Sequence, residues 1–159
     1  MNTFDPVRFQ FIADALYGLG GFRTGDYLVQ YPREAAEKFT RRKAMAWYAN
    51  ALRPACLRFV GYLTKRPPQR EVTQPAMTEF LDSCNWQNDS LDVFWSGFMV
   101  DAKARGSMLL LVDMPQPPST RTIPYLVAIE PERVKNYRLN AQGQLQSVTV
   151  QDWVMDKDG

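Results

Sequence analysis

The chain has 159 residues, of which 45% are hydrophobic, 13% aromatic and 23% charged. These values are typical of a globular domain with one core, and they exclude a disordered or fibrous chain. Histidine is absent from the sequence, which excludes Ser-His-Asp and Cys-His catalytic groups and zinc sites that need histidine. No secretory signal is recognisable and no apolar stretch approaches the ~20 residues that span a bilayer, so we expect an intracellular protein without a membrane segment.

Charge is distributed unevenly along the chain, although the net charge is only +2. Residues 1–70 carry 12 Lys and Arg against 5 Asp and Glu, a net charge of +7, whereas residues 71–159 carry 7 against 12, a net charge of −5. This polarity is typical of a region that faces nucleic acid, or of two halves or neighbouring subunits that attract one another. We favour the second interpretation.

The N-terminal segment is predicted to be an amphipathic helix followed by a linker. Asp5 and Pro6 form an N-cap and first-turn pair, and apolar residues then recur at helical spacing. Four glycines lie within residues 18–25, but no strand precedes them and no lysine follows, so a flexible linker is favoured over a nucleotide-binding loop. We therefore divide the chain into residues 1–30, a helix with a Gly-rich linker, and residues 31–159, one α+β domain.

Residues 32–64 are rich in helix formers and carry two apolar stripes. Pro54 lacks a backbone donor and disfavours helical geometry before it, so the segment is either two helices or one kinked helix. The prolines at 67–68 end it. The two cysteines, Cys56 and Cys84, fall in predicted helical contexts without a Cys-x-x-Cys partner, and we interpret both as reduced, buried apolar residues.

Three cations share one face of the first of these helices. Lys38, Arg41 and Arg42 are spaced at i, i+3 and i+4. Such a face can grip phosphate or contact a neighbouring subunit, and the commoner alternative is a solvated face partly paired with Glu34 and Glu37. These three cations are the only candidate contact residues that the sequence offers.

Two more helices are predicted in the middle of the chain. Pro75 begins a short one, and residues 85–90 form a polar break in which Asp89 or Ser90 caps the next. Gly106 stands at the C-terminal end of that next helix. Its apolar stripe, which we interpret as core rather than as a cofactor site, consists of Leu91, Phe94, Trp95, Phe98, Met99 and Ala102.

The last third of the chain is predicted to form a small, mostly antiparallel sheet, so the fold class is α+β, with amphipathic helices packed against that sheet. The expected elements are a buried strand over 108–112, a proline-rich loop over 115–121, a strand over 125–129, a turn over 131–134, and strands over 137–139 and 145–154 across a turn at 140–143. Asp158 and Gly159 are a hairpin signal with no returning strand. We therefore expect the sequence to be a piece of a longer protein, truncated at its C-terminal end.

No catalytic, cofactor-binding or metal-binding residue is predicted, so we expect a protein that is not an enzyme and carries no cofactor. Asp113 ends an apolar strand, as the magnesium aspartate of many ATPases does, but the sequence lacks the Gly-x-x-x-x-Gly-Lys-Ser/Thr loop that would hold phosphate. The acidic residues that a two-metal nuclease would need are interpreted as solvated faces, and they are Asp82, Asp89, Asp92 and Asp101. A magnesium-dependent phosphotransferase or nuclease around Asp113 stays an alternative.

The order of several short motifs resembles the N-terminal wing portion of portal proteins of tailed bacteriophages. The resemblance covers residues 31–152, and its motifs are Tyr31-Pro32-Arg33-Glu34, Gly61-Tyr62-Leu63-Thr64-Lys65-Arg66-Pro67, Ser90-Leu91-Asp92-Val93-Phe94, Ala104-Arg105-Gly106, Leu110-Leu111-Val112-Asp113-Met114-Pro115 and the stretch from Ile123 to Arg138. No single motif is diagnostic, and the ordered set carries the resemblance.

The resemblance implies a structural subunit of a ring, usually of twelve copies, at one vertex of the capsid. Its partners would be neighbouring portal subunits, capsid proteins and the terminase, and DNA would pass through without sequence-specific contacts during packaging and ejection. The protein would be found in the virion, and in the host cytoplasm before assembly. A DNA-binding accessory module that uses the basic helices is the first alternative.

Overall fold

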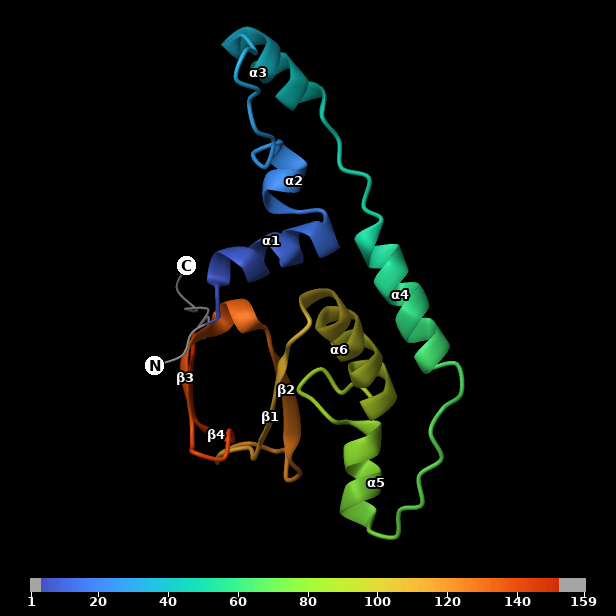
Figure 1. The fold of residues 1–159 in the computed structure, drawn as a ribbon. Coiled ribbons are helices and arrows are strands. Elements are labelled where there is room, and N and C mark those ends of the chain that lie inside the picture. The colour runs from blue at the N-terminus through green and yellow to red at the C-terminus, as the bar shows by residue number, and fades with distance from the viewer. Residues whose placement is uncertain (1–3, 152–159) are drawn as a thin grey trace.

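A computed structural model describes residues 4–151 of the chain (Figure 1). The helices are α1 (Pro6–Tyr17), α2 (Gly20–Thr24), α3 (Ala36–Met45), α4 (Leu52–Leu63), α5 (Pro75–Asp82), α6 (Leu91–Arg105) and a short 3₁₀ helix η1 (Pro131–Arg133). The strands are β1 (Leu109–Asp113), β2 (Tyr125–Ile129), β3 (Val134–Leu139) and β4 (Leu145–Val150). The fold is α+β, as the sequence predicts.

Local capping signals fix the ends of the two helices that the sequence places best. The Asp5 side chain accepts hydrogen bonds from the first-turn amides of α1, at 3.1 Å from Val7 N, and Ser90 caps α6 at 3.4 Å from Val93 N. Gly106 ends α6 in the left-handed region, at φ 75°. These caps confirm the predicted boundaries because they depend only on residues within one turn of the helix end.

Two predictions in the N-terminal half are wrong. The glycine segment that we expected to be a flexible linker contains α2, which lies between glycines in the left-handed region at Gly18 and Gly25. The 32–64 region forms two helices, which is one of the two predicted alternatives, but the break between them lies at residues 46–51 and not at Pro54. Pro54 instead lies in the first turn of α4, where a missing backbone donor leaves no helical hydrogen bond unmade.

The strands form two antiparallel pairs rather than one sheet. β1 pairs with β2 in the register Leu109 with Ile129, and β3 pairs with β4. The prediction that the first strand is buried is wrong, because most of β1 is exposed. β4 ends at Val150, and the predicted hairpin signal at 158–159 lies outside the described residues.

A small hydrophobic cluster joins helices from distant parts of the sequence. It consists of Leu16 from α1, Cys56 and Val60 from α4, and Val100 from α6. Both cysteines are buried and free, as predicted, although Cys84 follows the end of α5 and is not helical. The prediction that the apolar stripe of α6 is core is wrong: Trp95 is exposed, the other five residues of the stripe are half-buried, and the buried apolar residue of α6 is Val100.

A buried ionic network adds a polar tie between α1, α6 and η1. The Arg105 side chain, 4% exposed, pairs with Asp101 and with Glu132, whose Oε1 lies 2.8 Å from Arg105 Nη2. The Tyr17 hydroxyl donates to Asp101 Oδ1 at 2.8 Å. Burial and this hydrogen bond raise the pKa of Tyr17 above its ordinary value.

A second arginine holds the loop before α6 against the start of β2. The Arg121 guanidinium donates five hydrogen bonds, to Ser83 Oγ at 3.2 Å, Ser83 O at 2.5 Å, Asn85 O at 3.1 Å, Ile123 O at 3.2 Å and Pro124 O at 3.0 Å. Four of these acceptors are backbone carbonyls. Arg121 therefore joins the loop before α6 to the residues that lead into β2 by hydrogen bonds to their polar groups.

Candidate functional site

The three predicted contact residues lie on a projecting arm, which we define as residues 26–51. We call the remaining described residues, 4–25 and 52–151, the body. Figure 1 shows the arm, including α3, extending away from the helices and strands of the body. Its base is tied to α1 by polar contacts: the Tyr27 hydroxyl donates to Asp14 Oδ2 at 2.6 Å, Tyr48 Oη to Ala15 O at 2.9 Å, and Asn50 Nδ2 to Leu16 O at 2.8 Å. The base is thus held to α1 both where the chain enters the arm, at Tyr27, and where it leaves the arm, at Tyr48 and Asn50.

Four aromatic rings also pack at the base of the arm. Phe22 is central, with ring centroids 5.0 Å from Phe11, 4.9 Å from Tyr27 and 4.3 Å from Tyr48. The hydrogen bond to Asp14 raises the pKa of Tyr27 above its ordinary value. Aromatic packing together with the polar contacts sets the direction in which the arm leaves the body.

Arg42 serves the internal structure of the arm. Its Nε donates to Glu34 Oε1 at 2.9 Å and its Nη2 to Glu34 Oε2 at 2.7 Å, while Nη2 also reaches Val29 O at 2.9 Å. The guanidinium lies 4.7 Å from the ring centroid of Tyr31 and 5.2 Å from that of Phe39. These hydrogen bonds lower the pKa of the Glu34 carboxyl, and the predicted pairing of the basic face with Glu34 is confirmed.

Lys38 and Arg41 differ from Arg42 because both are exposed and, among residues 4–151, neither joins an ion pair. The neighbouring Lys43 pairs with Asp26, and this contact lowers the pKa of the Asp26 carboxyl. The structure therefore separates the predicted trio into one internal residue and two cations at the surface of α3.

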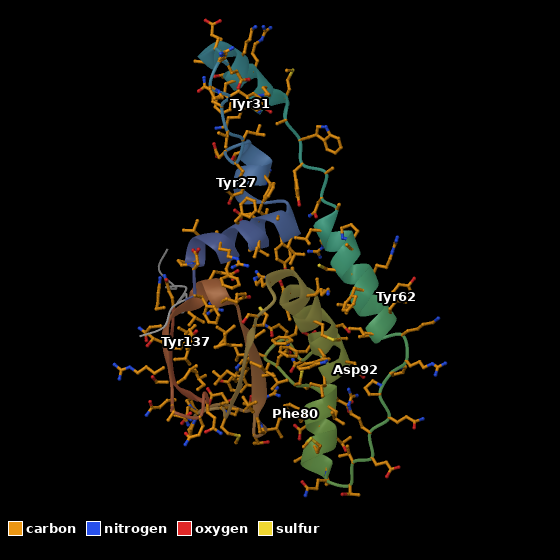
Figure 2. All side chains as sticks on the ribbon, in the orientation of Figure 1. Tyr27, Tyr31, Tyr62, Phe80, Asp92 and Tyr137 are labelled. Carbon is orange, nitrogen blue, oxygen red and sulfur yellow. The ribbon has the colours of Figure 1, made fainter. Side chains whose placement is uncertain are left out.

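The arm also exposes large apolar side chains that sequence reasoning missed. Trp47 is 82% exposed, Val29 79%, Met45 76% and Tyr31 66%. The sequence places Trp47 in a predicted apolar stripe, but helical spacing cannot tell whether another element covers that stripe. Figure 2 shows Tyr31 near the far end of the arm and Tyr27 nearer its base.

The arm has little internal packing to stabilise it. No residue within the described segment 26–51 is buried. α3 has only 10 residues and no side-chain hydrogen bond at its N-cap, and isolated helices of fewer than about 12 to 15 residues are marginal in water. The arm is thus built like a segment that another surface covers.

The whole chain exposes far more surface than a compact monomer of its size. Its accessible surface is 12248 Å², whereas a compact 18.3 kDa chain exposes about 8,100 Å². The difference of about 4,000 Å² is in the range buried by obligate protein–protein interfaces. This excess belongs to an extended shape that leaves much apolar surface in contact with water.

The acidic residues considered for metal chemistry do not converge. Asp113 is exposed and accepts a hydrogen bond from Tyr125 Oη at 3.0 Å, and Asp92 pairs with Arg70 at 2.6 Å. Asp101 belongs to the network around Arg105. Within residues 4–151, no group of three or more Cys, Asp or Glu side chains is placed to hold a metal ion.

A cleft on the body is lined by residues that are far apart in the sequence. It has a volume of about 430 Å³ and lies between the end of α4 and α6. Its lining includes the Arg70–Asp92 ion pair, with Trp95 and Met99 as apolar walls. The one carboxylate in this lining, Asp92, is thus engaged by an arginine of the same cleft.

Comparison with known protein families and with curated proteins finds no match to this chain. In the part of the chain that the structure describes, no helix is both long enough and apolar enough to cross a bilayer.

Proposed function

We propose that the chain is a structural subunit of a tailed-phage portal ring and forms part of its wing. The ordered motifs that resemble this family support the proposal, and they occupy distinct parts of the fold. The Tyr31 to Glu34 motif lies in the arm, the Gly61 to Pro67 motif at the end of α4, and the 110–115 motif in β1 and the residue pair after it. The proposed activity is mechanical and requires no cofactor.

The observation that carries the proposal is the exposed surface. A chain with about 4,000 Å² more surface than a compact monomer needs a partner to cover its apolar groups. A ring supplies that partner from identical copies, because each protomer presents two different surfaces to its two neighbours. The uneven charge of the two halves of the chain, +7 and −5, suits such a contact between unlike surfaces.

In this proposal the ring stands at one vertex of the virion, after assembly in the host cytoplasm. Capsid proteins and the terminase would be its partners, with twelve subunits as the expected number. DNA would pass through the ring without sequence-specific contacts, which require side chains that reach base edges in a groove.

Mass photometry across a range of protein concentrations tests the proposal, followed by negative-stain electron microscopy of any assembled species. We expect a discrete, closed homo-oligomer whose images show a ring. A chain that stays monomeric at every concentration, or that forms only open-ended aggregates, would contradict the proposal.

The DNA-binding alternative is favoured by one observation, the exposure of Lys38 and Arg41 without ionic partners in the described chain. Two phosphate contacts predict that raising salt from about 50 to 200 mM weakens duplex binding by about tenfold. Fluorescence anisotropy with labelled duplex measures this directly. Tight binding that is lost with Lys38→Ala/Arg41→Ala, in a chain that does not self-associate, would favour the alternative over the ring.

A further inference from the structure

We propose that the arm of one copy docks on the acidic end of the body of the next copy, in a head-to-tail contact. This inference rests on the proposed function and specifies the surfaces that two ring subunits share. The receiving surface, which we call the foot, consists of residues 71–82 and includes α5. Figure 1 shows α3 and α5 at opposite ends of the molecule, so one chain cannot bring its own arm and foot together.

The charges of the arm and foot are complementary. Within the arm, the pairs Arg42–Glu34 and Lys43–Asp26 cancel, which leaves three cations against one carboxylate. These four residues are Arg33, Glu37, Lys38 and Arg41. The foot contains three carboxylates and no Lys or Arg. Its acidic residues, Glu71, Glu79 and Asp82, are all exposed and join none of the ion pairs in the described chain.

The shapes and apolar surfaces of the two regions also fit a shared contact. A shallow hollow of about 210 Å³ lies beside the start of α5, with Val72 and Met77 as its apolar lining and Glu71 at its polar side. The same arm that carries the free cations also exposes two large aromatic side chains, Tyr31 and Trp47. An aromatic anchor beside charged residues is the common composition of an interface centre and its rim.

The contact is heterologous because arm and foot are different surfaces. A copy that makes one such contact keeps either its arm or its foot free, so a third copy can add, and the series closes into a ring where the rotation between successive copies allows it. Docking would also stabilise α3, since the partner surface supplies the burial that this short helix lacks within its own chain. The exposed area of about 4,000 Å² in excess of a compact monomer is sufficient for the two contacts that each ring subunit makes.

Charge reversal tests the pairing. The arm variant is Lys38→Glu/Arg41→Glu and the foot variant is Glu79→Lys/Asp82→Lys. Each should weaken self-association by about 10- to 100-fold in mass photometry, because two attractions become repulsions. The fourfold variant that combines both changes should recover self-association, since its reversed arm again faces a foot of opposite charge.

Mixing the two single-surface variants gives the sharpest readout. The intact foot of the arm variant matches the intact arm of the foot variant, and the reversed arm matches the reversed foot, so an equimolar mixture should co-assemble into oligomers in which the two variants alternate. A matched control, Lys135→Glu/Arg138→Glu, changes the net charge equally at exposed β3 positions and should assemble like the wild type. Circular dichroism of every variant shows whether the fold is retained.

The outcomes separate this inference from the proposed function. If both single-surface variants form the same rings as the wild type, the arm-to-foot contact is overturned and the ring proposal still stands. Loss of assembly in both variants without recovery in the fourfold variant, or without co-assembly on mixing, would also overturn the contact. A wild-type chain that never self-associates would contradict the ring proposal and the contact together.

Discussion

Replacing Arg105 by Met should destabilise the fold strongly, because it removes the only cation facing two inward-placed carboxylates in the described network. The Arg105 side chain is 4% exposed, and its partners Asp101 and Glu132 are 22% and 14% exposed. Removing one partner of a buried ion pair costs about 3 to 5 kcal/mol. Because water still reaches both carboxylates, we expect the lower end, about 3 kcal/mol.

Urea unfolding followed by circular dichroism measures this loss at low protein concentration. With a slope of about 2 kcal/mol/M, the midpoint should fall by about 1.5 M, and the melting temperature by about 9 °C. Adding Glu132→Gln to the Arg105→Met variant should restore part of the lost free energy, since one uncompensated charge disappears. Arg138→Met, at an exposed position, is the control and should stay within about 0.5 kcal/mol. A loss below that limit for Arg105→Met would refute the role of the network.

Three further predictions concern local structure. Gly20→Ala should lower the free energy of unfolding by at least about 2 kcal/mol, because Gly20 has φ +51° and an added Cβ would lie 2.0 Å from Asp14 Oδ2. Gly143→Ala, with φ +77° and open space around the added Cβ, is the control and should cost only about 1 kcal/mol. Equal losses in the two variants would contradict the crowding at Gly20. Arg121→Ala should cost about 2 kcal/mol in the same unfolding assay, and Arg121→Lys should recover less than half, since an ammonium cannot reach five acceptors. Burial raises the pKa of the Cys84 thiol above its ordinary 9.0, so the folded state favours the neutral thiol. The free energy of unfolding should therefore fall as the pH rises above 9.0. If a Cys84→Ala variant loses the same stability at alkaline pH, another group is responsible.

The sequence predicts the parts of this fold whose causes lie within a few residues. The cap at Ser90, the glycine that ends α6 and the strand over 125–129 all agree with the structure because capping and alternation act over short distances. The prediction of a flexible linker was wrong because α2 depends on contacts with distant residues. Several closely spaced glycines indicate conformational freedom, but they do not show the tertiary contacts that stabilise α2. Phe22, at the centre of the aromatic base, supplies those contacts.

Burial was harder to predict than secondary structure. The apolar run at 109–113 suggested a buried strand, but β1 pairs with a single strand and no element covers most of its side chains in the described structure. Trp47 shows the same limit, since an apolar residue at helical spacing is buried only if a second element packs on it. In the proposed ring, other copies would cover such side chains, so an apolar pattern need not lead to burial within one chain.

The surroundings of the three basic residues of α3 were predicted only in part, for a similar physical reason. Spacing placed Lys38, Arg41 and Arg42 on one helical face, but it could not show that Arg42 pairs with Glu34 and stacks near Tyr31. Such pairing depends on how the chain folds back before α3. It removes one of the three cations from any external contact and leaves two.

The arm divides positioning and contact between its two ends. At the base, Tyr27, Tyr48 and Asn50 are tied to α1 by hydrogen bonds, so the direction of the arm is fixed by bonds that a partner need not supply. At the far end, Lys38 and Arg41 remain exposed, so binding there would not first have to break an internal ion pair. In the proposed arm-to-foot contact, the base of the arm would lose little conformational entropy, and the entropic cost would fall mainly on the exposed side chains of α3.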